Sequence, residues 1–154
     1  MDPFRKIRGF TLLEVLVVLG IFMSTVFFGI AVSIPKIQQN RTEAVLSDIT
    51  SLMFLYQQNA YSGKNGKSYG IHFESDKYTM FTGETYAAAE TFDTIMLPAD
   101  TTISAISFND LGSDVIFTEG DLHPSTSGYV RMTNGATAYI LDINTEGFIR
   151  VNEE

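Results

Sequence analysis

The sequence predicts an α+β protein in which one long N-terminal helix packs on an antiparallel β-sheet. Two observations predict the helix: an apolar run from Phe10 to Ile34, and a stripe of apolar residues at helical spacing from Val45 to Ala60. The third observation is a change of pattern beyond Gly63, where short β-branched and aromatic runs alternate with turn residues. These patterns divide the chain into a basic leader (1–9), an apolar helix half (10–34), an amphipathic helix half (35–62) and a sheet domain (63–154).

The apolar run is long enough to cross a membrane. As a helix it would measure about 37 Å, against about 30 Å for the hydrocarbon core of a bilayer. The cations Arg5, Lys6 and Arg8 precede it and favour a cytoplasmic N-terminus. We therefore expect a single-pass protein of the inner (cytoplasmic) membrane whose C-terminal domain is periplasmic or extracellular.

Two simpler interpretations of this stretch remain open. A cleaved secretory signal would use Ala31-Val32-Ser33 as its cleavage site, but the apolar core of such a signal is only about 7–15 residues long and lacks acids. A plain signal anchor would have to tolerate Glu14, the one ionisable residue between Phe10 and Ile34. Because a carboxylate at mid-bilayer costs roughly 2.5–3.5 kcal/mol, Glu14 indicates a function and needs a partner.

The order of residues in this stretch points to a third interpretation. The segment Arg8-Gly9-Phe10-Thr11-Leu12-Leu13-Glu14-Val15-Leu16 resembles the class III signal of type IV pilins and type II secretion pseudopilins. The resemblance implies a pilin-like fold and a prepilin peptidase that cuts between Gly9 and Phe10 and N-methylates Phe10. It covers only the N-terminal third of the chain.

Glu14 fits this resemblance physically. Cleavage after Gly9 removes the basic residues of the leader and leaves one new ammonium, on Phe10, at the membrane edge. If subunits stack with an axial offset, that ammonium can meet Glu14 of a neighbour, and pairing offsets part of the cost of burying the carboxylate. Glu14 is therefore the predicted assembly residue.

The second half of the helix is predicted to begin after an interruption. Pro35 predicts a kink or a short break, because proline disfavours the helical conformation of the residue before it. The helix should end near Tyr61-Ser62-Gly63. The apolar stripe predicted to pack on the sheet consists of Val45, Ile49, Leu52, Met53, Tyr56 and Ala60. The residues off this stripe, favoured as a widened core over a patch facing a neighbour, are Leu46, Phe54 and Leu55.

The sheet domain is predicted strand by strand. A hairpin is expected from the runs at 69–73 and 78–81, followed by a loop at 83–93 with one helical turn at most. Further strands are expected at 94–97, 101–106 and 115–117, with Pro98 separating the first two. The Asn134-Gly135 pair is the strongest hairpin signal, so the strands at 129–132, 137–141 and 148–151 should form an antiparallel meander.

This tail carries a second resemblance. Its strand and glycine pattern is similar to the C-terminal half of the H-type minor pseudopilins and the FimT-like minor pilins. The pattern is Val115-Ile116-Phe117, Gly120, Ser127-Gly128-Tyr129-Val130, Ile140-Leu141-Asp142-Ile143-Asn144 and Gly147-Phe148-Ile149-Arg150-Val151. No catalytic residue is implied by it.

Composition and motifs argue against several other functions. The net charge of −8 disfavours a general nucleic-acid surface, although Lys64 and Lys67 could form a local patch. Cysteine is absent, and neither a P-loop nor a dinucleotide fingerprint occurs. His72 and His123 are interpreted as a strand and a loop residue rather than metal ligands, because no ligand spacing accompanies them. We therefore expect no enzyme, no metal and no cofactor.

One further group of oxygen-bearing residues needs an interpretation. Asp142, Asn144 and Glu146 alternate into a turn and could hold calcium, a site known near the C-terminus of major pseudopilins. Hairpin chemistry is the favoured interpretation, because a full EF-hand pattern is missing. Ser125, Thr126 and Ser127 lie near His123 in sequence, but proximity in sequence says little about catalytic geometry.

The first predicted function is structural: a minor pilin or pseudopilin of a type II secretion pseudopilus or type IV pilus. Its partners would be prepilin peptidase, other pilins or pseudopilins and the inner membrane, with no nucleic acid expected. The alternative is a minor pilin at a filament tip that binds DNA in competence, a surface or a secreted substrate. A remote third possibility is an enzyme on a signal anchor. Which machine the subunit serves stays open.

Overall fold

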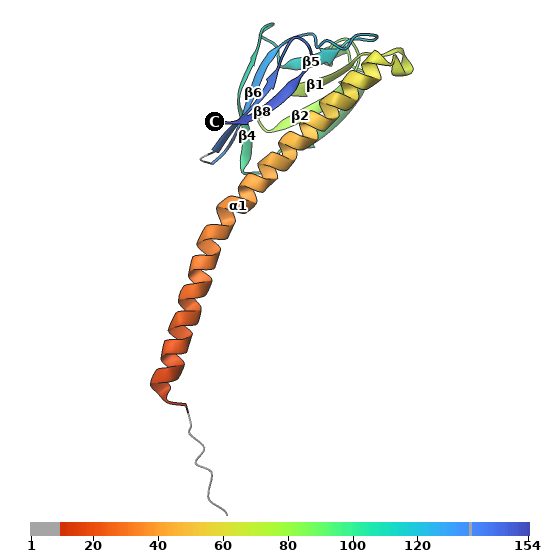
Figure 1. Cartoon of the computed structure of the whole chain (residues 1–154). Helices are drawn as coiled ribbons and strands as arrows, with labels where there is room; N and C mark the ends of the chain where they lie inside the picture. The colour runs from red at the N-terminus through yellow and green to blue at the C-terminus, as the bar shows by residue number, and fades with distance from the viewer. Residues whose placement is uncertain (1–9, 136) are drawn as a thin grey trace, which may run out of the picture. The chain divides into compact units, whose positions relative to one another are not determined.

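The computed structural model describes residues 10–135 and 137–154, and within residues 28–39 only the course of the backbone. Arg5, Lys6, Arg8 and Gly9 therefore lie outside the described residues. By its internal contacts the chain divides into two compact units, 1–37 and 38–154. The architecture is the predicted α+β, pilin-like arrangement, with one N-terminal helix followed by antiparallel strands (Figure 1).

Helix α1 runs from Leu12 to Tyr61 and comprises 50 residues. It ends where the sequence predicted, but it continues through position 35, so the alternative of a short break at Pro35 is wrong, and the alternative of a kink there stays a prediction. Proline costs a helix one backbone hydrogen bond, yet its fixed φ near −65° is itself helical. A helix with long flanking segments on both sides can therefore accommodate one proline without ending.

The strands are arranged as two four-stranded antiparallel sheets rather than the single sheet that the sequence predicted. The first sheet has the order β3-β2-β1-β5, and the second has the order β4-β6-β7-β8. The strands of the first sheet are β1 (Tyr69–Phe73), β2 (Lys77–Thr82), β3 (Thr91–Met96) and β5 (Asp114–Phe117). Those of the second are β4 (Thr101–Phe108), β6 (Gly128–Asn134), β7 (Thr137–Ile143) and β8 (Ile149–Glu153).

In the first sheet the predicted β1–β2 hairpin is confirmed, with Ile71 opposite Met80. The loop after it is shorter than predicted, because β3 already begins at Thr91. Two threonine pairs across β2 and β3 account for the earlier start: the hydroxyls of Thr82 and Thr91 lie 2.6 Å apart and a second pair repeats the contact further along. The predicted single helical turn is present as a 3₁₀ turn over Tyr86–Ala88.

In the second sheet the predicted meander is confirmed as β6-β7-β8. The sequence did not show that β4 would pair with the outer edge of β6, with Thr101 opposite Asn134 and Phe108 opposite Gly128. This pairing joins segments that are distant in sequence. It could therefore not be predicted from a turn between the two strands. It places Thr101 against Thr42 of α1, whose hydroxyl oxygens are 2.9 Å apart in the core.

The hydrophobic core lies between the second half of α1 and both sheets. Ile49, Met53 and Ala60 of the predicted stripe are fully buried, and Leu46 joins them as favoured. The interpretation of Phe54 and Leu55 as core is wrong, because 56% of Phe54 and 48% of Leu55 remain exposed. The helix thus buries one face and leaves two large apolar side chains on another.

Strand β1 needs a glycine at position 70 because the ring of Phe81 packs directly against the backbone there, and not because the backbone has an unusual conformation. A Cβ at Gly70 would lie 2.3 Å from the ring of Phe81 on the neighbouring strand. Phe81 is fully buried and so has no room to move aside. The glycine therefore lets an aromatic ring cover the strand.

Candidate functional site

The first turn of α1 is capped by Thr11. Its side-chain Oγ1 accepts a hydrogen bond from the Glu14 backbone N–H at 3.3 Å, and its carbonyl accepts from the same N–H at 3.1 Å. A threonine three residues before a glutamate is the sequence signature of a capping box. Thr11 was not among the residues predicted from the sequence, although it stands at capping-box spacing from Glu14.

Glu14 lies exposed in this first turn. The positive end of the helix dipole favours its carboxylate there, by about 0.3–1 kcal/mol for an exposed position. Within the described part of the chain, Glu14 has no cationic partner. Phe10, the predicted N-terminus after cleavage, is exposed next to this turn.

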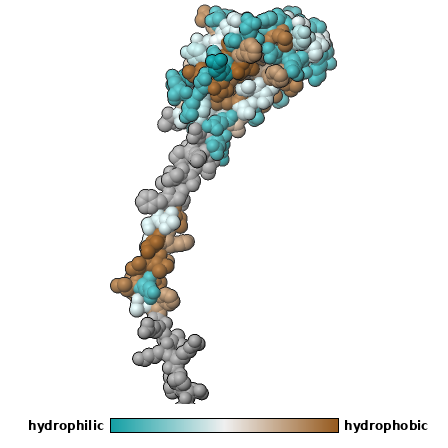
Figure 2. All heavy atoms as spheres, in the orientation of Figure 1, coloured by the Kyte–Doolittle hydropathy of each residue, from teal (hydrophilic) through white to brown (hydrophobic). Residues whose placement is uncertain are grey.

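The apolar side chains of the same segment are exposed on every side of the helix. Figure 2 shows them as brown atoms along the N-terminal part of α1. They include Phe10, Leu12, Leu13, Val15, Leu16, Val17, Val18, Leu19, Ile21, Phe22, Met23, Val26 and Phe27. The part of the chain described by the structure contains no helix that meets the length and hydropathy of a membrane span. Side chains 28–34 of the predicted span lie outside the described residues.

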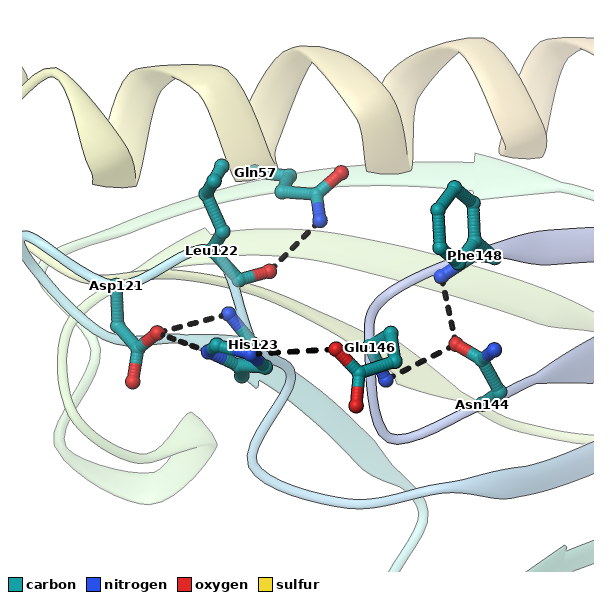
Figure 3. A network of polar contacts seen from close by, with 7 residues as sticks. All are labelled: Gln57, Asp121, Leu122, His123, Asn144, Glu146 and Phe148. Atoms are coloured by element: carbon teal, nitrogen blue, oxygen red, sulfur yellow. Dashed lines mark hydrogen bonds and ion pairs between the residues drawn. The ribbon is translucent and has the colours of Figure 1, made fainter.

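A second candidate site lies on the 38–154 unit, between α1 and the β7–β8 turn. It is a groove of about 610 Å³ that the sequence did not predict. The groove is lined by Thr50, Ser51, Phe54, Gln57, Gln58, Leu122, Glu146, Gly147, Phe148 and Ile149. Phe148 is 74% exposed, and Figure 3 shows its ring directed toward α1. The groove is therefore mostly apolar and open to solvent.

Two contacts hold the loop at Leu122 and the β7–β8 turn against α1. The Gln57 side-chain Nε2 donates to the Leu122 carbonyl at 2.7 Å (Figure 3). Gly147 passes directly beneath the same amide, where a Cβ would lie 2.3 Å from Nε2. Its φ of +80° also lies in the region that favours glycine. Gly147 therefore lets the turn approach the helix closely.

The turn itself is built on Asn144. Its side-chain Oδ1 accepts from the backbone N–H of Glu146 at 3.0 Å and from that of Phe148 at 2.8 Å. This is the turn chemistry that asparagine commonly provides, and it occupies the oxygen that the calcium hypothesis would have used. Among the described residues, no group of three or more His, Cys, Asp or Glu side chains is arranged to hold a metal ion.

His123 links the 118–127 loop to the β7–β8 turn (Figure 3). The Asp121 carboxylate accepts from the His123 backbone N–H at 2.9 Å and contacts its Nδ1 at 2.7 Å. On its other side, His123 Nε2 lies 3.7 Å from the Glu146 carboxylate. The hydrogen bond and charge of Asp121 raise the pKa of His123 above its usual 6.5. The hydrogen bonds from His123 lower the pKa of Asp121 below 3.8.

We expect this link to be strongest in weak acid. A raised histidine pKa stabilises the fold below the usual value of 6.5 and stops doing so as the pH rises through the raised pKa. A lowered aspartate pKa contributes above 3.8 and is lost as the pH falls further. An NMR titration should give His123 a pKa above 6.5, and Asp121→Asn should bring it down. A His123 pKa unchanged by Asp121→Asn would contradict the link.

His72 belongs to a different cluster. It lies on β1, where Nδ1 contacts the Asp114 carboxylate and Nε2 lies 3.7 Å from Glu74. Its ring stacks on Tyr86 at a centroid distance of 3.9 Å. The strand and loop positions predicted for His72 and His123 are thus confirmed.

The hydroxyl of Ser125 is engaged away from His123. It accepts from the Ile116 backbone N–H at 3.1 Å, and the Ser125 N–H donates to the Ile116 carbonyl at 2.7 Å. The serine therefore fastens its loop to β5.

Comparison with known families identifies the N-terminal segment. Residues 4–26 match the family described as the prokaryotic N-terminal methylation motif. The match supports the type IV pilin and pseudopilin class, with processing by prepilin peptidase and assembly with other pilins. No curated protein and no solved structure matches the chain.

Proposed function

We propose that this chain is a minor pilin or pseudopilin, a structural subunit of a type II secretion pseudopilus or a type IV pilus. The observation that carries the proposal is the methylation motif at residues 4–26, which runs into a capped helix with apolar side chains exposed on every side. A helix that is apolar all round needs lipid or other helices to cover it. An anchor in the inner membrane followed by a bundle of neighbouring subunits supplies both.

The proposed processing follows from the charges of the segment. Cleavage between Gly9 and Phe10 would remove Arg5, Lys6 and Arg8 and create a methylated ammonium on Phe10. Glu14 has no cationic partner within the described residues, so the ammonium of a neighbouring subunit can serve as one. Pairing in a low-dielectric place favours the assembled register over other registers.

Gly9→Val should leave the precursor uncut. The peptidase must reach the backbone at the cut, and we expect a β-branched side chain beside it to block access. Intact mass of the membrane-extracted protein, with wild type in parallel, measures the outcome. A mature wild-type species that begins at unmethylated Met1 or after Ser33 would contradict the proposal.

A second candidate function is that of a binding module at a filament tip. The groove with its exposed Phe54 and Phe148 favours it, because an exposed apolar patch commonly marks an interaction site. The net charge of −8 makes a protein partner more favourable than DNA. An electrophoretic mobility shift of DNA by the purified protein would reverse that preference. In either function we propose a role without catalysis.

A further inference from the structure

Strand β8 has a free edge. It is the last strand of its sheet and pairs only with β7 among the described strands. At one end of this pair Asn144 N–H donates to the Phe148 carbonyl, and at the other end Glu154 N–H donates to the Ala138 carbonyl. Hydrogen-bonded and non-hydrogen-bonded pairs alternate along antiparallel strands. The even-numbered residues of β8 therefore bond to β7, and the backbone groups of Ile149, Val151 and Glu153 point to the free edge.

The free edge borders the groove. Ile149 lines the groove and also packs partly against the core. Val151, two residues further on the same face of the strand, is 41% exposed. Phe54 on α1 lines the same groove as Ile149 and is exposed as well. An apolar surface thus runs along the last strand of the sheet, next to backbone groups that no described strand pairs.

An extended polypeptide is the ligand that matches both features. Only a polypeptide backbone presents N–H and C=O groups at the spacing of a strand edge, and its alternate side chains would enter the groove. A lipid or a small apolar molecule would cover Phe54 and Phe148 but leave the edge unpaired.

The charges of the rim indicate which polypeptide fits. Glu146 stands at one end of the groove and Glu153 at the end of β8, and both are exposed. A second copy of this chain fits poorly, because each copy carries a net charge of −8 and its other described edge strands, β3, β4 and β5, contain no lysine or arginine. A partner with lysine or arginine at both ends of an apolar strand complements the rim.

We propose that the free edge of β8 and the adjoining groove bind an extended segment of a partner protein by strand addition, with apolar residues alternating along the segment and cations at its ends. The inference rests on the geometry of the 38–154 unit and is independent of N-terminal processing. It assigns a partner surface to the 38–154 unit, in addition to the exposed apolar side chains of the N-terminal part of α1.

The probe is the peptide acetyl-Lys-Val-Thr-Val-Thr-Phe-Lys-amide, added to the full chain in detergent micelles. Two matched peptides separate the contribution of the end charges from that of the backbone hydrogen bonds. One has both lysines replaced by glutamate, and the other has the same side chains with alternate backbone nitrogens methylated, which removes strand hydrogen bonds. Amide hydrogen exchange of Ile149, Val151 and Glu153 reports the edge directly. We expect these three amides to become protected by the lysine peptide and by neither matched peptide.

Two variants test the surface from the protein side. Val151→Pro removes an N–H of the free edge and leaves the bonds to β7 in place, so it should weaken binding about tenfold without unfolding the sheet. Phe54→Asp should abolish binding, whereas Leu55→Asp, an exposed neighbour outside the groove, should not change it. If Val151→Pro lowers the melting temperature, the methylated peptide alone decides whether the peptide binds through hydrogen bonds to the edge of β8.

Several results would overturn the inference. Equal binding of the methylated peptide would mean adsorption to an apolar patch without strand addition. Equal binding of the glutamate peptide would remove the charge argument. Protection of the three amides without any peptide, together with a dimer in solution, would assign the edge to a second copy. Failure of the lysine peptide to bind at millimolar concentration would show that the edge does not accept a strand.

Discussion

Met53→Asp should unfold the 38–154 unit. Met53 is fully buried in the core between α1 and the sheets, and none of the described residues of that core is a cation. Burying an unpaired carboxylate costs several kcal/mol, which is a large part of the 5–15 kcal/mol that typically stabilises a domain. Thermal unfolding of a chain that begins at Lys36, followed by circular dichroism, measures the effect. We expect the cooperative transition to be lost or lowered by more than about 10 °C.

Leu55→Asp on the same helix is the matched control. It introduces the same charge two residues away, at a side chain that is 48% exposed, and should change the free energy of unfolding by less than about 0.5 kcal/mol. Leu52→Asp, at a half-buried side chain, should lower the melting temperature by an intermediate amount. An unchanged melting temperature for Met53→Asp, or equal effects of the two changes, would show that the packing face of α1 is placed wrongly.

Glu14→Leu should yield a subunit that is inserted and cut but enters filaments poorly. The change removes the carboxylate that we expect to meet the Phe10 ammonium of a neighbour, and it leaves the ammonium unpaired in a low-dielectric place. If Glu14 were merely tolerated, its removal would help insertion and harm nothing. Intact mass measures processing, and co-purification with sheared filaments measures incorporation. We expect incorporation to fall at least about tenfold, since a lost charge pair costs more than 1.4 kcal/mol.

The cap on the first turn provides the control for this experiment. Thr11→Ala removes the side-chain hydrogen bond to the Glu14 N–H and should destabilise the helix start by about 1 kcal/mol while leaving the Glu14 carboxylate in place. If Thr11→Ala impairs incorporation as strongly as Glu14→Leu, the role of Glu14 lies in the helix start and not in pairing. Equal incorporation of Glu14→Leu and wild type would contradict pairing outright. Failure of cutting would place Glu14 in recognition by the peptidase.

Local sequence patterns by themselves determined most of the secondary structure. The stripe containing Ile49, Met53 and Ala60 predicted the packing face of α1, because residues three or four apart in sequence lie on the same face of a helix. The Asn134-Gly135 pair predicted the β6–β7 hairpin, because only a tight turn joins strands so closely. The processing motif was equally local: it lies in a short run of residues and needs no fold around it.

The tertiary structure alone decided how distant segments meet. The pairing of β4 with β6, the division into two sheets and the exposure of Phe54 all depend on contacts between segments far apart in sequence. A helical wheel cannot tell a widened core from an exposed patch, since both need only apolar residues on neighbouring faces. The groove depends on the same contacts: Gln57, Leu122 and Gly147 become neighbours only when α1, a loop and a turn have packed together.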